Sequence, residues 1–320
     1  MKWAIVGAGA IGGVVGAELH RIGEDVTLVA RGEHGAAIRR HGLTFVDPVG
    51  RRALPIPVAG SVAELELHDG DVVVLAVKAQ HTAGLLEQLA VVAPPGIRIV
   101  CAQNGIDNER QSARFFGEVI GASVTLLATH LEPGVLMAHS DPVLGTLQLG
   151  RYPAGTDGVA EVADVLGRTR IRVDVLPDVM AFKNAKLRVN LANALEVICT
   201  EAGDRAPLVE RLLAEASAVF EAAGMPVPGP GVATPVPEPV DAATPRTGGS
   251  TRQSVQRGAG SVETDYLNGE IVLLGRLHGI PTPANELLQQ LAREVIAGRL
   301  AAESVPPEEL LARSSADRSL

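Results

Sequence analysis

Three glycines near the N-terminus have the spacing of a turn that holds phosphate groups. They form a G-x-G-x-x-G pattern that follows directly on an apolar run ending in Ile5-Val6. The first glycine permits a tight turn, the second lets the backbone approach a pyrophosphate, and the third lets a helix pack closely on the strand. The start of that helix offers unpaired N–H groups and partial positive charge. The residues predicted to bind a cofactor here are Gly7, Ala8, Gly9, Ala10, Ile11 and Gly12.

The surroundings of this pattern predict a strand, a helix and a second strand. An apolar helical run follows the glycines, and Asp25-Val26-Thr27-Leu28-Val29-Ala30 then reads as a strand that ends at Arg31. A glycine-rich turn without a ligand would have the same three glycines. The strand–helix–strand order around them instead indicates a unit that binds a dinucleotide.

Arg31 bears on which dinucleotide is bound. An NAD site usually carries an acidic residue at the end of the second strand, and here that position holds Arg31. A guanidinium suits a 2′-phosphate because its planar fork meets two phosphate oxygens. The sequence therefore favours NADPH as the cofactor. The alternative is a solvated loop cation, and Glu33, two residues later, keeps the question open.

Composition narrows the class of protein. The chain has 320 residues, a net charge of −9 and only 2% aromatic residues, which argues against nucleic-acid binding and against an anionic membrane surface. Cys101 and Cys199 lie in apolar runs without metal-ligand spacing, so both are predicted to be reduced core residues, and no metal site is expected. No run has the length and apolarity of a membrane span. We expect a cytoplasmic protein that binds a small molecule.

The order of apolar runs predicts two domains. Strands alternate with helices over 1–176, which predicts an α/β domain of Rossmann type with a doubly wound sheet, extended by antiparallel strands between about 118 and 150. Residues 177–320 carry helical patterns alone and predict an all-α substrate and dimerisation domain, interrupted by a proline-rich loop over 225–245. The predicted helices of this domain are 178–201, 206–223, 248–258, 262–279 and 283–302, with a polar, frayed tail from about 303.

Polar residues follow two more strands of the predicted sheet. Lys78 ends the strand that starts at Asp71, and Asn104 follows the strand over 97–102. A lysine here could simply reach solvent, and Asn-Gly is a common turn. Ligands of open α/β sheets bind beyond the carboxyl ends of the strands, so the two residues together favour one shared pocket.

A helix at the start of the second domain carries a polar stripe. Lys183, Lys186, Asn190 and Asn193 fall within about 80° when 100° is allowed for each residue. Such a stripe faces solvent or lines a cleft, and two asparagines favour the cleft because asparagine is a poor helix former. Glu263 follows Ser261 at the start of a later helix, where a carboxylate complements the helix dipole.

These segments together resemble the ketopantoate reductase family. The resemblance rests on five motifs in the family order across almost the whole chain: Gly7-Ala8-Gly9-Ala10-Ile11-Gly12-Gly13, Val77-Lys78-Ala79-Gln80, Gln103-Asn104-Gly105, Lys186-Leu187-x-x-Asn190 and Glu263-Thr264-Asp265-Tyr266-Leu267-Asn268-Gly269. It implies an NADPH-dependent reduction of 2-dehydropantoate to (R)-pantoate, with the active site between a Rossmann domain and a helical domain.

The resemblance also implies a role for each matching residue. Lys186 would be the catalytic proton donor to the carbonyl oxygen, and Glu263 the acid that helps bind the substrate hydroxyl. Arg31 and Lys78 would contact the cofactor. The remaining residues would contact the substrate, with Asn104 also on the nicotinamide side: Asn104, Asn190, Asn193, Ser250 and Thr251.

The chain departs from the family pattern near the catalytic lysine. The family often has a second asparagine eight residues after that lysine, where this chain has Ala194 and places Asn193 instead, and Lys183 is an additional lysine. These departures leave open a paralogous reductase of another 2-keto acid. A non-catalytic NADP(H)-binding sensor is the alternative from a different class. A homodimer is compatible with the helical domain, and the sequence does not fix the oligomeric state.

Overall fold

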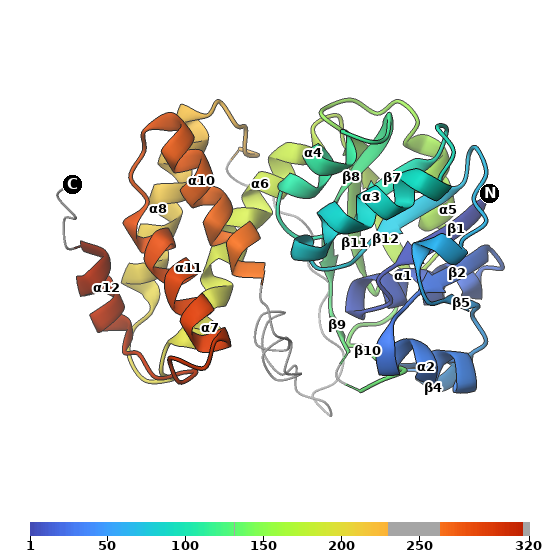
Figure 1. Cartoon of the computed structure of the whole chain (residues 1–320), viewed down its shortest axis with the longest axis horizontal. Helices are drawn as coiled ribbons and strands as arrows, with labels where there is room; N and C mark the ends of the chain where they lie inside the picture. The colour runs from blue at the N-terminus through green and yellow to red at the C-terminus, as the bar shows by residue number, and fades with distance from the viewer. Residues whose placement is uncertain (131, 230–262, 316–320) are drawn as a thin grey trace. The chain divides into compact units, whose positions relative to one another are not determined.

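The described residues form two compact units. The structure is a computed structural model that describes residues 1–130, 132–229 and 263–315. Met1–Lys183 make up most of the first unit, and Asn184–Pro228 with the residues from Glu263 onward make up the second (Figure 1).

The first unit is built on an eight-stranded sheet. Its order is β12-β11-β8-β7-β6-β1-β2-β5, and every neighbouring pair is parallel except β8 with β11. The strands are β1 (Lys2–Val6), β2 (Asp25–Val29), β5 (Val58–Ala59), β6 (Val72–Leu75), β7 (Arg98–Cys101), β8 (Glu118–Leu126), β11 (Gly145–Arg151) and β12 (Ile171–Val175). Because β1 pairs with β2 on one side and with β6 on the other, the strand order reverses direction at β1, which is where such sheets bind ligands.

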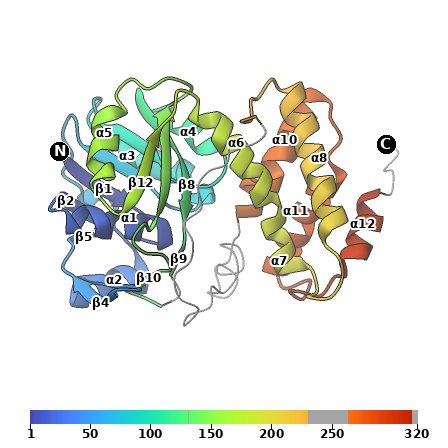
Figure 2. The same ribbon diagram turned by 180° about the vertical axis from the view of Figure 1, so that it is seen from behind.

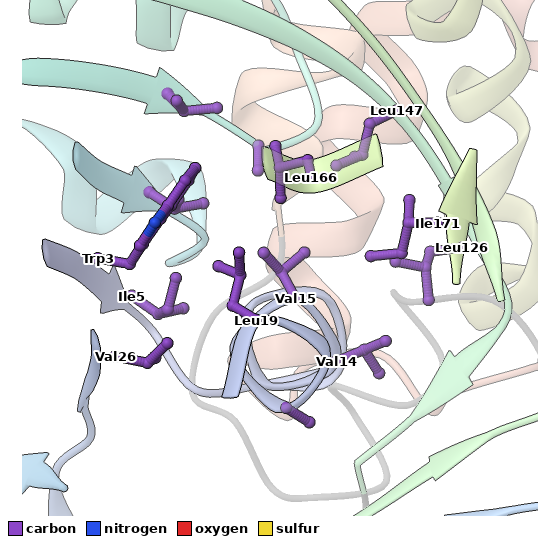
Figure 3. Close-up of a cluster of buried hydrophobic side chains, with 14 of the residues drawn as sticks. Trp3, Ile5, Val14, Val15, Leu19, Val26, Leu126, Leu147, Leu166 and Ile171 are labelled. Atoms are coloured by element: carbon purple, nitrogen blue, oxygen red, sulfur yellow. The ribbon is translucent and has the colours of Figure 1, made fainter. Parts of the chain in front are cut away.

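Helices cover both faces of this sheet. Successive side chains of β1 point to opposite faces, and both sets are buried. Trp3 and Ile5 pack with α1 (Ala10–Arg21) and α5 (Ala160–Gly167) on one face (Figures 2 and 3), whereas Ala4 and Val6 pack with α3 (Thr82–Val92) on the other. Strands buried on both faces read as continuous apolar runs, as β6 does. The Rossmann-type, doubly wound fold class is confirmed.

The predicted antiparallel extension of the main sheet was wrong in part, because some of its strands belong to a second, four-stranded sheet. β8 and β11 do pair antiparallel, but the short strands between them leave the main sheet. They join two strands from the early chain in the order β4-β3-β10-β9. The members are β3 (Leu43–Asp47), β4 (Gly50–Leu54), β9 (Ala128–Thr129) and β10 (Val135–Ala138). Two helices, α2 (Gly32–His41) and α4 (Asp107–Ser112), and the 3₁₀ turns η1 (Val62–Glu64) and η2 (Ala79–His81) complete the unit.

The second unit is helical throughout its described part, apart from one bridge between Cys199 and Val305. α11 lies against α7, α8, α10 and α12. The elements are the end of α6 (Val179–Asn190), η3 (Leu191–Ala194), α7 (Leu195–Ile198), α8 (Ala206–Ala222), η4 (Glu263–Tyr266), α10 (Asn268–His278), α11 (Pro283–Ile296) and α12 (Pro307–Ser315). The all-α class of this half is confirmed.

Two details of the helical prediction were wrong. The segment 178–201 is not one helix, because α6 passes into a 3₁₀ turn after Asn190. The tail predicted to fray from about 303 instead forms α12, whose Leu310 is fully buried. The predicted helix 248–258 and all of the proline-rich loop beyond residue 229 lie outside the described residues. In the described part of the chain, no helix combines the length and the apolarity needed to cross a membrane.

Candidate active site

The glycine-rich turn joins β1 to α1, and the backbone angle and the space around its glycines differ from one position to the next. Gly7 has φ of +101°, a backbone conformation that favours glycine. A Cβ atom at Gly12 would lie 2.1 Å from the Gly7 carbonyl oxygen, whereas a Cβ at Gly9 would meet nothing within 4 Å. Gly12 therefore serves packing, and Gly9 leaves the turn open on its outer side. The first turn of α1 holds no acidic residue, so its N-terminal N–H groups keep their full attraction for an anion.

His34 ties this turn to the helix that follows β2. Its Nε2 lies 2.7 Å from the Ala8 carbonyl oxygen, and its Nδ1 lies 2.9 Å from the Gly134 backbone nitrogen and 3.0 Å from Nε2 of His130. A backbone N–H donates, so Nδ1 must accept, and the proton of His34 then lies on Nε2 and points at Ala8. Arg31 is the exposed N-cap of the same helix, α2, so His34 and Arg31 both belong to the start of that helix.

The predicted cofactor residues lie at adjacent strand ends. β7, β6, β1 and β2 are consecutive parallel neighbours, and their carboxyl ends therefore lie on one edge of the sheet. Asn104 follows β7, Lys78 follows β6, the glycine-rich turn follows β1 and Arg31 follows β2. Strands are about 4.8 Å apart, so the row extends roughly 15 Å from the β7 end to the β2 end.

A network of buried side chains holds the backbone at Asn104. Asn108 Nδ2 donates to the Asn104 carbonyl oxygen at 2.9 Å. Thr82 Oγ1 donates to Asn108 Oδ1 and accepts from Gln103 Nε2, both at 2.9 Å. Thr82, Asn108 and Gln103 are at most 5% exposed. The Asn104 carboxamide takes no part in this network, so the network fixes its backbone and leaves its side chain available.

Lys183 holds the same turn from the side of α6. Its Nζ forms an ion pair with Glu109 and donates to the Gln103 carbonyl oxygen at 3.0 Å. The side chains of Lys183 and Glu109 are 2% and 0% exposed. Burial raises the pKa of Glu109, and the Lys183 ammonium opposes that shift. Lys183 is therefore not part of an open polar stripe with Lys186, as its helical spacing suggested.

The second unit carries the other predicted catalytic and substrate residues. Lys186 lies on α6 and is half-buried, Asn190 ends the same helix, and Asn193 lies on η3. Asn193 Nδ2 lies 3.5 Å from Asn190 Oδ1, which orients the Asn190 amide. Asn190 Nδ2 is buried, and among the described residues no acceptor lies within hydrogen-bond reach of it. Glu263 is 5% exposed at the first position of η4.

A buried chain of polar contacts fixes the backbone just beyond Asn190. Asn268 Nδ2 donates to the Leu191 carbonyl oxygen at 3.1 Å and to Asn285 Oδ1 at 3.0 Å. Asn285 Nδ2 in turn donates to Glu215 at 2.8 Å, and Glu215 also accepts from the first N–H groups of α11. Helices α8, α10 and α11 thereby hold η3 in place.

Each unit gathers a part of the predicted site. The first holds the glycine-rich turn, Arg31, Lys78 and Asn104, and the second holds Lys186, Asn190, Asn193 and Glu263. Ser250 and Thr251 lie outside the described residues. No sequence pattern indicated Glu109 or its contact with Lys183, and His34 was not among the predicted residues. The only available signal for His34 was its place three residues after Arg31. In the described ranges, no three His, Cys, Asp or Glu side chains cluster in a way that could hold a metal ion.

Comparison with known proteins shows the family to which the chain belongs. A family model described as ketopantoate reductase PanE/ApbA matches residues 3–154, and the corresponding C-terminal model matches residues 184–296. The 2-dehydropantoate 2-reductase of Pyrococcus abyssi is 31% identical over 311 residues, which cover 93% of this chain and 100% of the relative.

Solved structures extend the comparison. A PanE/ApbA family ketopantoate reductase from Ralstonia eutropha is 26% identical, with a TM-score of 0.78 over 93% of this chain and 99% of the other. A D-mandelate dehydrogenase in complex with NADH and anilino(oxo)acetate has the same TM-score and coverage at 21% identity. At that identity the second likeness concerns the fold alone.

Proposed function

Because the chain belongs to the ketopantoate reductase family, an oxidoreductase family that uses a nicotinamide cofactor, we propose that it catalyses the NADPH-dependent reduction of 2-dehydropantoate to (R)-pantoate. One observation carries the proposal. Four neighbouring parallel strands bring Asn104, Lys78, the glycine-rich turn and Arg31 to one edge of the sheet. The row crosses the point at β1 where the strand order reverses, which is where open α/β sheets bind dinucleotides.

The residues at this edge fit NADPH. The open outer side of Gly9 and the uncompensated N-terminus of α1 suit a pyrophosphate. Arg31 suits a 2′-phosphate because its guanidinium stands at the end of β2, where an NAD site usually has an acidic residue. Lys78 follows β6, the strand between β1 and β7, and would contact the cofactor between the glycine-rich turn and Asn104. When bound, NADPH supplies the hydride that reaches the 2-keto carbon.

Lys186 is the proposed proton donor. Its ammonium would stabilise the negative charge that develops on the carbonyl oxygen and would then deliver a proton to it. Lys183, the other lysine of α6, is unsuited to this task, because its Nζ is buried and already engaged with Glu109 and the Gln103 carbonyl oxygen. Lys186 is half-buried whereas Lys183 is buried, and this difference in exposure supports the assignment of Lys186.

Amide and carboxylate groups complete the proposed substrate site. Asn190 Nδ2 is a buried donor with no acceptor among the described residues, which suits a ligand oxygen. Asn193 orients that amide, Glu263 would accept a hydrogen bond from the substrate hydroxyl, and Asn104 would contact the substrate from the nicotinamide side. Ser250 and Thr251 remain predicted substrate contacts.

One feature favours a second candidate, a reductase of another 2-keto acid. Residue 194, where the family often has its second asparagine, is an alanine that is 2% exposed. The loss of one amide would change which substituent the site recognises without changing proton delivery. A sensor that binds NADP(H) without turnover has no use for Lys186, so we rank it last.

The test is oxidation of NADPH, followed at 340 nm, with 2-dehydropantoate beside a panel of other 2-keto acids and with NADH in parallel. Fastest turnover with 2-dehydropantoate and NADPH is the expected result. Turnover with another keto acid alone would retain the mechanism and replace the substrate. Binding of NADPH without turnover of any 2-keto acid would contradict the proposal.

A further inference from the structure

The buried ion pair between Lys183 and Glu109 lies where it can control the position of Asn104. Lys183 Nζ contacts the carboxylate of Glu109 on α4 and the Gln103 carbonyl oxygen at 3.0 Å, and it approaches the Cys101 carbonyl oxygen at 3.5 Å. The two carbonyl groups belong to the end of β7 and to the residue directly before Asn104. All of these residues belong to the first unit.

The cost of burying these two charges indicates that the pair has a purpose beyond stability. Removing two charges from water costs several kcal/mol each, and a well-packed apolar pair is often as stable as a buried ion pair. An ammonium has three donors, which leucine or methionine lacks, and here they reach the strand end and the start of α4. What the ion pair adds over apolar packing is therefore the position of the backbone.

The contacts around Asn104 are arranged so that a shift at Lys183 would reach its carboxamide. Lys183 fixes the carbonyl group before Asn104, and Asn108 fixes the carbonyl group of Asn104 itself. Gly105 follows with φ of +81°, a backbone conformation that favours glycine, so the chain turns directly after Asn104. Because both carbonyl groups are held, the Cα–Cβ bond of Asn104, from which its carboxamide extends, is held in position.

We propose that Lys183 and Glu109 are positioning residues for the reduction, which act by holding the Gln103-Asn104-Gly105 turn so that the Asn104 carboxamide meets the substrate and the nicotinamide in the reactive geometry. This inference rests on the proposed function. Neither residue touches a reacting atom. Positioning errors of about 1 Å can cost roughly 100-fold in rate, so a modest loosening of this turn has a measurable effect.

The test removes both charges together. Removing one partner leaves a buried unpaired charge and destabilises by about 3–5 kcal/mol, whereas a double change to apolar residues of similar volume is often neutral. We therefore compare K183M/E109L with the wild-type chain and with Arg110→Met, which breaks an exposed ion pair on the same helix α4. If the K183M/E109L variant does not fold, K183M/E109Q, which also leaves no buried charge, replaces it with the same expected results.

The expected result separates positioning from stability. The double variant is expected to bind NADPH with a Kd within about twofold of wild type, and its kcat/KM is expected to fall roughly 10- to 100-fold. In an Asn104→Ala background the same double change should cost nothing further, because its effect passes through Asn104. A kcat/KM equal to wild type, or an equal loss with and without Asn104, would overturn the proposal.

Hydrogen–deuterium exchange gives a readout that does not need turnover. Peptides that cover residues 101–112 are expected to exchange faster in K183M/E109L than in wild type and Arg110→Met. If the wild-type chain reduces no 2-keto acid, the proposed function fails, and exchange still decides whether the ion pair holds the turn. Unchanged exchange over 101–112 would show that it does not.

Discussion

His34 Nε2 lies 2.7 Å from the Ala8 carbonyl oxygen, so the helix after β2 is bonded directly to the glycine-rich turn after β1. The other ring nitrogen accepts from the Gly134 N–H, which fixes the ring between two loops. Replacing His34 by alanine removes about 1 kcal/mol of hydrogen bonding from this corner. We expect the KM for NADPH to rise roughly fivefold, with the KM for the keto acid unchanged. His41→Ala, an exposed histidine at the far end of α2, is the control in steady-state assays.

Arg31 is predicted to separate NADPH from NADH. A guanidinium bound to a phosphate contributes roughly 2–3 kcal/mol, so Arg31→Ala should weaken NADPH binding by about 30-fold or more. NADH binding should change by less than about twofold, since NADH has no 2′-phosphate. Titration of both cofactors by fluorescence checks this, with the exposed Arg51→Ala as the control. Equal losses for the two cofactors would refute the assignment.

Alanine is predicted to have opposite effects at two glycines of the glycine-rich turn. Gly12→Ala places a Cβ 2.1 Å from the Gly7 carbonyl oxygen and should destabilise the fold by about 3 kcal/mol or more. Gly9→Ala has no steric conflict in the protein and should change stability by less than about 1 kcal/mol. The same Cβ would lie where the pyrophosphate approaches, so NADPH affinity should fall roughly tenfold or more. Thermal unfolding with and without NADPH measures both effects. A Gly9→Ala variant that binds NADPH normally would move the pyrophosphate away from this turn.

The contacts of Arg170 are predicted to make the stability of the fold depend on pH in the acidic range. It contacts Glu18 at 2.7 Å and Asp47 at 2.9 Å, and both carboxylate side chains are nearly fully buried. Burial by itself raises the pKa of each carboxylate, but hydrogen bonds and charge from Arg170, with Arg21 at Glu18 and Arg52 at Asp47, lower both below the ordinary 4.5 and 3.8. Groups with lowered pKa stabilise the fold above their ordinary pKa, and that stability is lost as pH falls through the folded value.

Arg170→Met should therefore destabilise the chain by about 3 kcal/mol at pH 7. The difference from wild type should shrink as pH falls below the ordinary carboxylate pKa of about 4.5, and it should be lost as pH falls through the lowered pKa values of Glu18 and Asp47 in the folded wild-type chain. Urea unfolding from pH 3 to 7 measures it. Arg172→Met, which breaks an exposed pair with Asp174, should change stability by less than about 0.5 kcal/mol at every pH. A difference that stays constant with pH would contradict the electrostatic explanation.

The sequence predicted the elements that have a local signal and missed those that depend on distant contacts. The glycine-rich turn, the buried strand β6 and the strand end at Asn104 follow from patterns of a few residues, and the structure has them. Lys183 was placed in the polar stripe of α6 because helical spacing cannot show that Glu109, 74 residues earlier, is its partner. The helix α12 was missed because its sequence is polar, and the burial of Leu310 comes from tertiary packing. The separate four-stranded sheet depends on pairing of β3 with β10, which no local pattern encodes.

The central claim is that this chain is a 2-keto acid reductase in which Lys186 delivers the proton. The most direct measurement is the rate of NADPH oxidation with saturating 2-dehydropantoate for wild type and Lys186→Ala, together with the NADPH Kd of each. We predict rapid turnover by the wild-type chain, and a kcat at least about 100-fold lower in the variant with an NADPH Kd within about twofold. An equal kcat in both proteins, or no turnover by the wild-type chain, would contradict the account.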